Sequence, residues 1–212
     1  MAVTIGYDGL VKMLEAAVLQ IKNNHETLSK LDSHGGDGDH GTTMVRATGC
    51  IEKAIADCGV PRIKDLLQGI GWAIMGVDGG ATGPLFGTLF MSMADAAGPD
   101  DPLDVQGLAT MFEAGLAGVR KRTKAQSGDK TMIDALVPAI DILRAAANAG
   151  ADIPEAMGQA ADAALKGAES TKTMQARFGR AKNIGEKSVG EQDPGATSVA
   201  LMFRGFAQGV KE

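Results

Sequence analysis

The chain is organised around Leu31-Asp32-Ser33-His34-Gly35-Gly36-Asp37-Gly38-Asp39-His40-Gly41-Thr42-Thr43. This segment is too polar to lie in a protein core, because it contains three carboxylates and four glycines. Carboxylates this close repel one another unless a cation lies between them, and hard oxygen ligands suit Mg²⁺ or Ca²⁺ rather than zinc. The glycines allow sharp turns and leave backbone N–H groups free to approach an anion. The segment therefore indicates a site for a metal ion and a phosphate.

Three common sequence patterns do not account for this segment. Residues 36–41 match the dinucleotide-binding pattern G-x-G-x-x-G, but that pattern follows a strand, and here a polar helix is expected before it. An EF-hand loop beginning at Asp37 requires Asp or Asn, then Gly, and later Glu where the chain has Gly41, Thr42 and Thr48. The P-loop ending Gly-Lys-Ser/Thr does not occur in the sequence. The remaining alternative is an ordinary Asp/Gly-rich connection between helices.

The composition favours a single domain, residues 1–212, built from helices. A chain of 212 residues is long enough for one hydrophobic core. Hydrophobic residues make up 44% and charged residues 22%, which is typical of a globular protein. Aromatic residues make up only 4%, which favours close packing of helices over a β architecture. We therefore expect an all-α fold.

Charge and cysteine content narrow the class of protein further. The formal net charge of −5 argues against direct nucleic-acid binding, which needs a basic surface. No apolar run reaches membrane-spanning length and no signal peptide is recognisable, so we expect no membrane association and a cytoplasmic location. Cys50 and Cys58 lie on one expected helix with their Cα atoms about 12 Å apart, too far for a disulfide within that helix.

Apolar residues recur at helical spacing in eight ranges: 9–31, 44–58, 63–75, 85–97, 105–121, 129–149, 154 through 168 towards 174, and 194–210. A turn is expected at 98–102. Trp72 is expected to pack in the core. Thr131 and Asp134 are expected to form a variant of the capping box, and Asp193 is expected to cap the last helix, with Pro194 in its first turn.

Two further loops are candidates for function. Residues 76–84 form a second glycine cluster directly before a helix, which is a phosphate-binding geometry, although glycine-rich helix connections are also common. Residues 177–192 are rich in Arg, Lys and Gly and lack helical periodicity. They resemble a basic lid loop, the alternative being a solvated surface loop.

Four ordered motifs make the chain recognisable across nearly its whole length. Leu31-Asp32 with residues 36–42 is the first, and residues 79–88, 128–134 and 190–198 are the others. Together they resemble the nucleotide-binding L subunit of dihydroxyacetone kinase. The resemblance implies an antiparallel barrel of eight amphipathic helices, with the nucleotide bound at one end by the connecting loops.

The resemblance also implies ligands for the site. It implies that Asp32, Asp37 and Asp39 hold two Mg²⁺ ions that bridge the phosphates of ADP or ATP. It implies that the nucleotide is contacted by His40, Gly41, Thr42, Thr43, Gly80, Ala81, Thr82, Met132, Arg180, Asp193, Pro194 and Gly195. Among these, Met132 borders the adenine, and Arg180 closes over the nucleotide with residues 193–195.

A substrate site is missing from the sequence, which implies a partner. In the family that the chain resembles, a histidine of a separate K subunit holds the ketone substrate, whereas this chain has only His25, His34 and His40 and no second domain. The chain is therefore expected to be half of a kinase, and also a homodimer. Its nucleotide either exchanges as ATP or stays bound as ADP and is rephosphorylated by a phosphohistidine protein of the sugar phosphotransferase system.

Three alternatives remain open at this point. The lid reads Arg180-Ala181-Lys182-Asn183 where the family often has Arg-Ala-Ser-Tyr, so the substrate could be a related ketose such as erythrulose. A second alternative is a regulatory module, because some L subunits act as co-activators of a transcription factor. A third is a free-standing nucleotide hydrolase.

Overall fold

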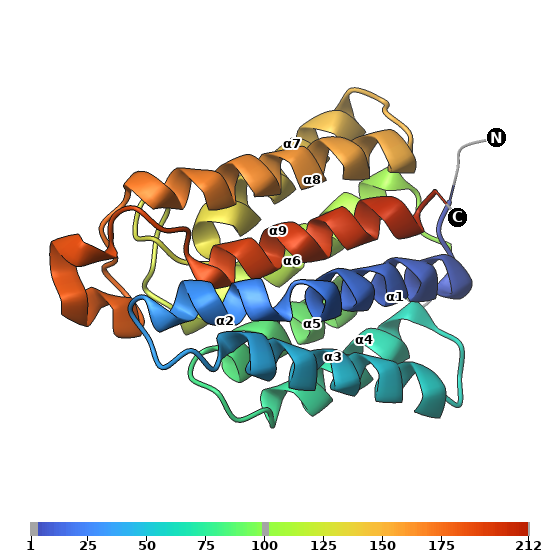
Figure 1. Cartoon of the computed structure of the whole chain (residues 1–212). Helices are drawn as coiled ribbons and strands as arrows, with labels where there is room; N and C mark the ends of the chain where they lie inside the picture. Colours follow the sequence, from blue (N-terminus) through green and yellow to red (C-terminus); the bar gives the residue numbers. More distant parts are fainter. Residues whose placement is uncertain (1–3, 99–101, 212) are drawn as a thin grey trace.

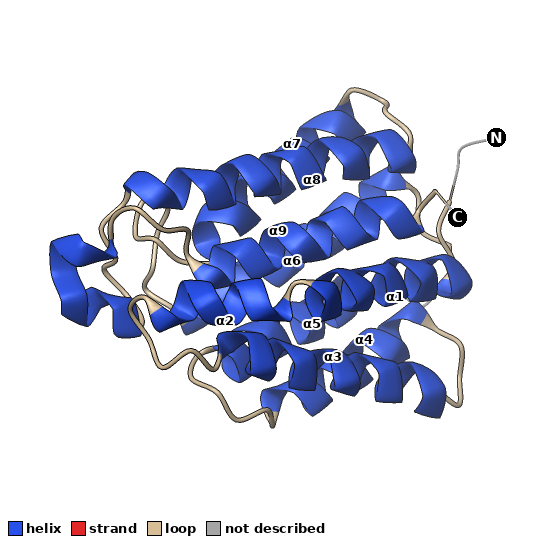
Figure 2. Cartoon of the chain, in the orientation of Figure 1, coloured by secondary structure: helices blue, strands red, loops and turns tan. Residues whose placement is uncertain are grey.

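The computed structural model describes residues 4–98 and 102–211. Within these ranges it contains nine α-helices and two 3₁₀ segments, and its only β contact is the isolated bridge between Ile5 and Leu103 (Figure 2). The α-helices are α1 Tyr7–Asn23, α2 His25–Ser33, α3 His40–Asp57, α4 Ile63–Met75, α5 Thr82–Ala96, α6 Val105–Arg122, α7 Ile133–Asn148, α8 Ile153–Ser170 and α9 Pro194–Gly209. The 3₁₀ segments are η1 Thr171–Thr173 and η2 Arg180–Ser188. The predicted all-α fold is confirmed.

The number of helices differs from the predicted eight because the first one is broken. At Asn24 the backbone leaves the helical region, with φ −117° and ψ 10°, and the chain continues as the separate helix α2. Residues 180–188, expected to be irregular, form η2 with a kink at Gly185, where φ is 56°. The turn expected at 98–102 lies mostly outside the described residues.

The helices pack as a circuit of neighbours. Each of α3 to α8 contacts the next helix in the sequence, α3 contacts α1, and α9 contacts both α8 and α1. Figure 1 shows the helices lying side by side, with α1 beginning and α9 ending at the right-hand end. Such a circuit is what the expected barrel requires, and the antiparallel barrel itself stays a prediction.

Close approach between helices relies on glycine and alanine. A Cβ atom on Gly205 of α9 would lie 2.3 Å from the Cα atom of Ala17 of α1. A Cβ atom on Gly167 of α8 would likewise lie 2.2 Å from the carbonyl oxygen of Asp134 of α7. Real side chains do not tolerate such distances, so the backbones touch only because no side chain intervenes. This agrees with the close packing that the low aromatic content predicted.

Capping aspartates define where several helices begin. Asp104 accepts a hydrogen bond from the Gly107 amide at the start of α6. Asp152 does the same at α8 and Asp193 at α9, where Pro194 occupies the first turn as predicted. These side chains satisfy amides that have no partner within their own helix.

The prediction that Trp72 packs in the core is wrong, since 62% of its surface is exposed. Ile70 and Ile74 direct one face of α4 into the core. At about 100° per residue, Trp72 falls on the opposite face.

Cys50 and Cys58 are both free thiols, as expected. No helix among the described residues is long and apolar enough to cross a membrane.

The loops with the predicted functional motifs gather at one end of the molecule. In Figure 1 the α2–α3, α4–α5 and α6–α7 connections lie at the left-hand end, together with the orange-red segment η2. This end is opposite to the one where α1 begins and α9 ends. Three of the four motifs, which are far apart in the sequence, are thus brought together with part of the predicted lid loop.

Candidate functional site

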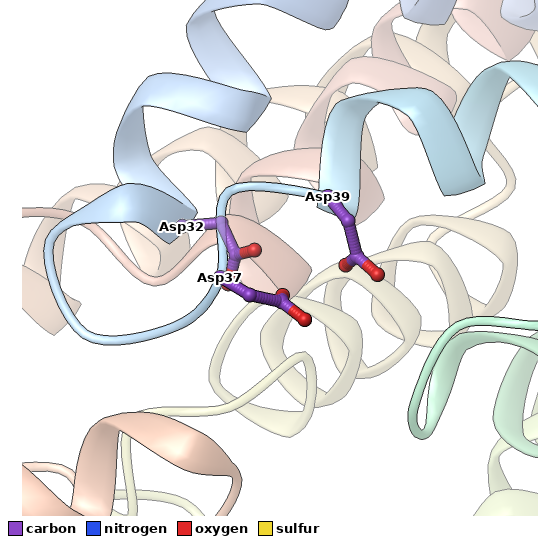
Figure 3. A group of neighbouring side chains, drawn as sticks. All are labelled: Asp32, Asp37 and Asp39. Atoms are coloured by element: carbon purple, nitrogen blue, oxygen red, sulfur yellow. The ribbon is translucent and has the colours of Figure 1, made fainter.

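Three aspartates form a compact acidic cluster at the α2–α3 connection. Asp32 lies in the last turn of α2, Asp37 in the loop, and Asp39 at the N-cap of α3. One carboxylate oxygen from each lies within 4.8 Å of the others, and Figure 3 shows the carboxylates on one side of the loop. A Cβ atom on Gly36 would be 2.3 Å from an Asp32 carboxylate oxygen, so a side chain at this position would displace that carboxylate.

The donor set of the acidic cluster fits a hard divalent cation, because all three ligands are carboxylate oxygens. The pKa of Asp39 is raised above its ordinary value, first by burial and then by the neighbouring charge of Asp37. Arg180 offsets part of this repulsion: its guanidinium pairs with Asp37 and lies 3.7 Å from an Asp39 oxygen. The α2–α3 loop and the start of η2 are therefore joined by an ion pair.

Only one of the first four residues of α3 lines the cavity. His40 lines the cavity, and its Nε2 atom lies 2.8 Å from the Ser198 hydroxyl oxygen. Burial lowers the pKa of His40, which favours its neutral form. Gly41 and Thr43 are buried and Thr42 is exposed, and none of these three lines the cavity. The structure therefore brings only His40 of this motif into the cavity wall.

The second glycine cluster forms the entry to α5. Gly80, Ala81 and Thr82 line the cavity, with Ala81 as the N-cap. Gly79 and Gly80 both have positive φ values, 142° and 57°. A Cβ atom on Gly79 would lie 2.4 Å from the Thr43 hydroxyl oxygen, and this oxygen is buried without a hydrogen-bond partner among the described residues. The first and second motifs are therefore in direct contact.

One cavity of about 390 Å³ connects these motifs, a volume typical of small-ligand sites. Its wall is mixed: it has an apolar part, which includes Leu31, Phe86 and Met132, and a polar part from the loops. The predicted site residues that line it are Asp32, Asp39, His40, Gly80, Ala81, Thr82, Met132, Arg180, Asp193, Pro194 and Gly195. Asp37 is joined to this wall through the acidic cluster and Arg180.

Segment 177–190 lies across one side of the cavity. Phe178 and Arg180 line it, and Arg177 pairs with Asp129 at 3.4 Å while Arg180 pairs with Asp37. The segment is thus anchored on the α6–α7 connection and on the α2–α3 connection. His34 adds a contact, with its Nε2 atom 2.8 Å from the carbonyl oxygen of Lys187.

Several residues of the cavity wall were not among the predicted site residues, and Phe178 and Lys130 are two of them. Phe178 lies in the segment that was expected to be a basic loop. Lys130 belongs to the third motif, but exposed lysines are so common that its type carries no signal of burial. In the structure only 5% of its surface is exposed. The capping by Asp134 was anticipated: its carboxylate accepts hydrogen bonds from the Thr131 and Gly128 amides.

The N-terminus of α9 contributes a carboxyl group with an unusual protonation equilibrium. Burial raises the pKa of Asp193 from 3.8 to about 7, while the Ala196 amide and the Lys130 ammonium act in the opposite direction. The carboxyl group accepts a hydrogen bond of 2.7 Å from that amide. Asp193 therefore changes charge near neutral pH.

Replacing Asp193 by asparagine is expected to change how stability depends on pH. Because the folded-state pKa is raised, Asp193 stabilises the fold most at low pH and loses this contribution as the pH rises through about 7. Asparagine still caps α9 but does not ionise. As the pH rises from acidic to alkaline, the free energy of unfolding of the wild type should therefore fall relative to that of Asp193→Asn. The expected fall is a few kcal/mol, at roughly 1.4 kcal/mol per pKa unit. Urea denaturation at acidic and at alkaline pH measures this, and parallel curves for the two proteins would contradict it.

Comparisons with known proteins agree with the motifs. The model of the DAK2 domain family matches residues 34–208. The ADP-binding subunit DhaL of the PEP-dependent dihydroxyacetone kinase of Escherichia coli (strain K12) is 44% identical over 190 residues, which cover 88% of this chain and 89% of that subunit. The L-erythrulose 1-kinase of Mycolicibacterium smegmatis is 35% identical over 203 residues. The match covers 94% of this chain and 35% of that kinase.

A solved structure has the same fold. The crystal structure of the dihydroxyacetone kinase from C. freundii in complex with AMP-PNP and Mg²⁺ superposes with a TM-score of 0.73 and 28% sequence identity. The match covers 98% of this chain and 35% of that one. The solved protein therefore contains a region that corresponds to this chain and a larger remainder that does not.

Proposed function

Because this chain belongs to the DAK2 domain family, we propose that it is the nucleotide-binding subunit of a two-component dihydroxyacetone kinase. The observation that carries the proposal is convergence on one cavity: the acidic cluster and the N-termini of α3, α5 and α9 all meet there. Helix N-termini attract phosphate through free amides and the helix dipole, and carboxylates attract the accompanying cation. This combination suits a metal-bound nucleotide.

The proposal assigns a role to each part of the cavity. Asp32, Asp37 and Asp39 hold two Mg²⁺ ions, which when bound would neutralise charge on the phosphates and on the transferred group. Phosphate is contacted from His40 at α3, and from Gly80, Ala81 and Thr82 at α5; Gly41, Thr42 and Thr43, which the resemblance also assigned to the phosphate, do not line the cavity. Met132 borders the adenine, and Arg180 closes over the nucleotide with Asp193, Pro194 and Gly195. The chain thus positions the nucleotide and supplies charge, which is most of what phosphoryl transfer requires of a protein.

The second component carries the ketone. In the proposed reaction a hydroxyl oxygen of the ketone substrate attacks the γ-phosphorus, and the bond from that phosphorus to the oxygen bridging the β-phosphate breaks. ADP leaves, the hydroxyl proton is released, and no residue of this chain is phosphorylated. The substrate is held by a separate K subunit. A homodimer and a cytoplasmic location complete the proposal, and the nucleotide is either exchanged as ATP or rephosphorylated in place by a phosphohistidine protein. Native mass spectrometry after dialysis separates retained ADP, which fits the phosphohistidine donor, from an empty site, which fits exchange with ATP.

A related ketose is the second candidate substrate. It is favoured by the 35% identity with the L-erythrulose 1-kinase and by the lid residues Lys182 and Asn183, which replace the Ser-Tyr often found in the family. The co-activator role has no comparable support. Capture of a transcriptional regulator, and no K-type subunit, by the tagged chain in its native host would favour that role over the kinase.

Kinase activity is expected only when both components are present. Mixing this chain with a K-type subunit, Mg²⁺ and a phosphoryl donor should phosphorylate dihydroxyacetone, whereas the chain alone should neither phosphorylate the ketone nor hydrolyse ATP. A coupled assay with ATP and one with a phosphohistidine donor measure the reaction, and erythrulose in parallel compares the substrates. Steady Mg²⁺-dependent ATP hydrolysis by the chain alone would instead identify a free-standing hydrolase.

A further inference from the structure

Lys130 has a backbone conformation that is unfavourable for its residue type. Its φ is 60°, and it is the only non-glycine residue with positive φ among the described residues. The Cβ atom of an L-residue is crowded in this conformation, which glycine adopts freely, as Gly128 does with φ 96° two positions earlier. Residues held in this way occur mainly where the surrounding structure and the function require them. We therefore expect the Lys130 side chain to make interactions that offset the strain.

The Lys130 side chain joins two distant segments. The side chain is buried, and its Nζ atom donates hydrogen bonds to the carbonyl oxygens of Thr171 at 2.6 Å and of Glu191 at 2.5 Å. Thr171 begins η1 directly after α8, and Glu191 lies just before α9. Three parts of the chain, the α6–α7 connection, the end of α8 and the approach to α9, therefore meet at one ammonium group.

The segment held by this ammonium is a wall of the cavity. Lys130, Glu191, Asp193 and Gly195 all line the cavity. The Asp193 amide donates to the Thr171 hydroxyl oxygen at 2.9 Å, so the same anchor also holds the residue that caps α9. Loss of the ammonium would leave two carbonyl oxygens without their charged donor. The 191–195 wall would then lose the hydrogen bond that ties it to the α6–α7 connection.

We propose that Lys130 is a positioning residue of the nucleotide site, and that its ammonium holds residues 191–195 in the place that the bound nucleotide requires. It acts through the wall and does not contact the reacting atoms. The inference rests on the proposed function, because it presumes that the cavity binds a nucleotide. The acidic cluster has no hydrogen bond or ion pair with Lys130 among the described residues, so metal binding should not depend on this residue.

The test compares Lys130→Gly and Lys130→Met with Lys124→Gly, an exposed lysine of the same connection. Calorimetry with ADP and Mg²⁺ should show affinity about tenfold weaker or more for both Lys130 variants, since charged hydrogen bonds are lost, and unchanged affinity for Lys124→Gly. Mn²⁺ binding, followed by electron paramagnetic resonance without nucleotide, should be the same in all four proteins. Butylammonium should restore part of the ADP affinity of Lys130→Gly, whereas tetramethylammonium, which has no N–H donor, should not.

The outcomes distinguish a failure of the proposed function from a failure of the positioning role of Lys130. If the wild type does not bind ADP, the proposed function fails. If the wild type binds ADP and Lys130→Met binds it equally well, the positioning role is overturned, whether or not Lys130→Gly folds. Loss of Mn²⁺ binding together with ADP binding, or the absence of rescue by butylammonium in a folded Lys130→Gly protein, would also overturn it by showing a general structural role.

Discussion

The Asp37→Asn variant is expected to lose metal-dependent nucleotide binding while keeping its helical content. Asp37 shares the acidic cluster with Asp32 and Asp39, and one oxygen of each lies within 4.8 Å of the others. Asparagine keeps the shape of the side chain but removes a negative charge and one hard ligand atom. Residues that hydrogen-bond to metal ligands without touching the metal already contribute about 10–100-fold to metal affinity. Removal of a ligand itself should therefore cost more than that.

Calorimetry with ADP and Mg²⁺ measures this loss, and circular dichroism checks the helices. Asp162→Asn on α8 is the matched control, because it makes the same chemical change at an exposed helical position. Asp37 also pairs with Arg180, so Arg180→Gln is needed to separate the two effects. Mn²⁺ binding without nucleotide should survive in Arg180→Gln and disappear in Asp37→Asn. Nucleotide affinity close to that of the wild type in Asp37→Asn would show that the metal assignment is wrong.

Gly205→Ala is expected to be strongly destabilising, although alanine is the better helix former. A Cβ atom at Gly205 would lie 2.3 Å from the Cα atom and 2.5 Å from the backbone nitrogen of Ala17. Backbone atoms cannot rotate away as a side chain does, so α9 and α1 must move apart. Overpacking of this kind costs about 1–3 kcal/mol or more. The α1–α9 contact closes the circuit of helices, so the strain falls on the whole fold.

Gly69→Ala on α4 is the control for this prediction. Gly69 is exposed, and a Cβ atom there meets nothing within 4 Å. The same substitution should therefore stabilise the protein by about 0.4–1 kcal/mol, because it reduces the freedom of the unfolded chain. Urea denaturation of the two variants should give shifts of opposite sign. A shift of the same sign and size in both would mean that the α1–α9 contact is not as close as the structure shows.

Much of the fold was predictable because its signals are local. The helix at Ile63–Met75 has the predicted bounds, since its apolar periodicity ends at a proline-containing turn on one side and at a glycine on the other. Asp193 and Pro194 identified the start of α9 through capping chemistry alone. The break at Asn24 was missed because the apolar pattern continues through it from α1 into α2, with Ile21 and Leu28 both buried. Trp72 was misplaced because its residue type favours burial whereas its helical phase directs it outward.

The candidate site was predictable as a set of motifs but not as an arrangement. The acidic cluster was expected because three aspartates occur within one short glycine-rich segment. Which side chains line the cavity was not: Gly41, Thr42 and Thr43 belong to the first motif, yet they lie outside its wall. Lys130 gave no signal, because a left-handed buried lysine cannot be recognised from residue type or spacing.

By itself the sequence determined the all-α class, the approximate position of most helices, the capping residues and the chemical character of the loops, because each of these depends on residues close together in the chain. Only the tertiary structure decided which loops meet, that Arg180 pairs with Asp37, and that Lys130 joins the end of α8 to the approach to α9. These contacts link residues that are 41 to 143 positions apart, as in the Lys130–Thr171 and Arg180–Asp37 pairs. Such contacts form only when packing closes the circuit of helices, and no local pattern specifies them.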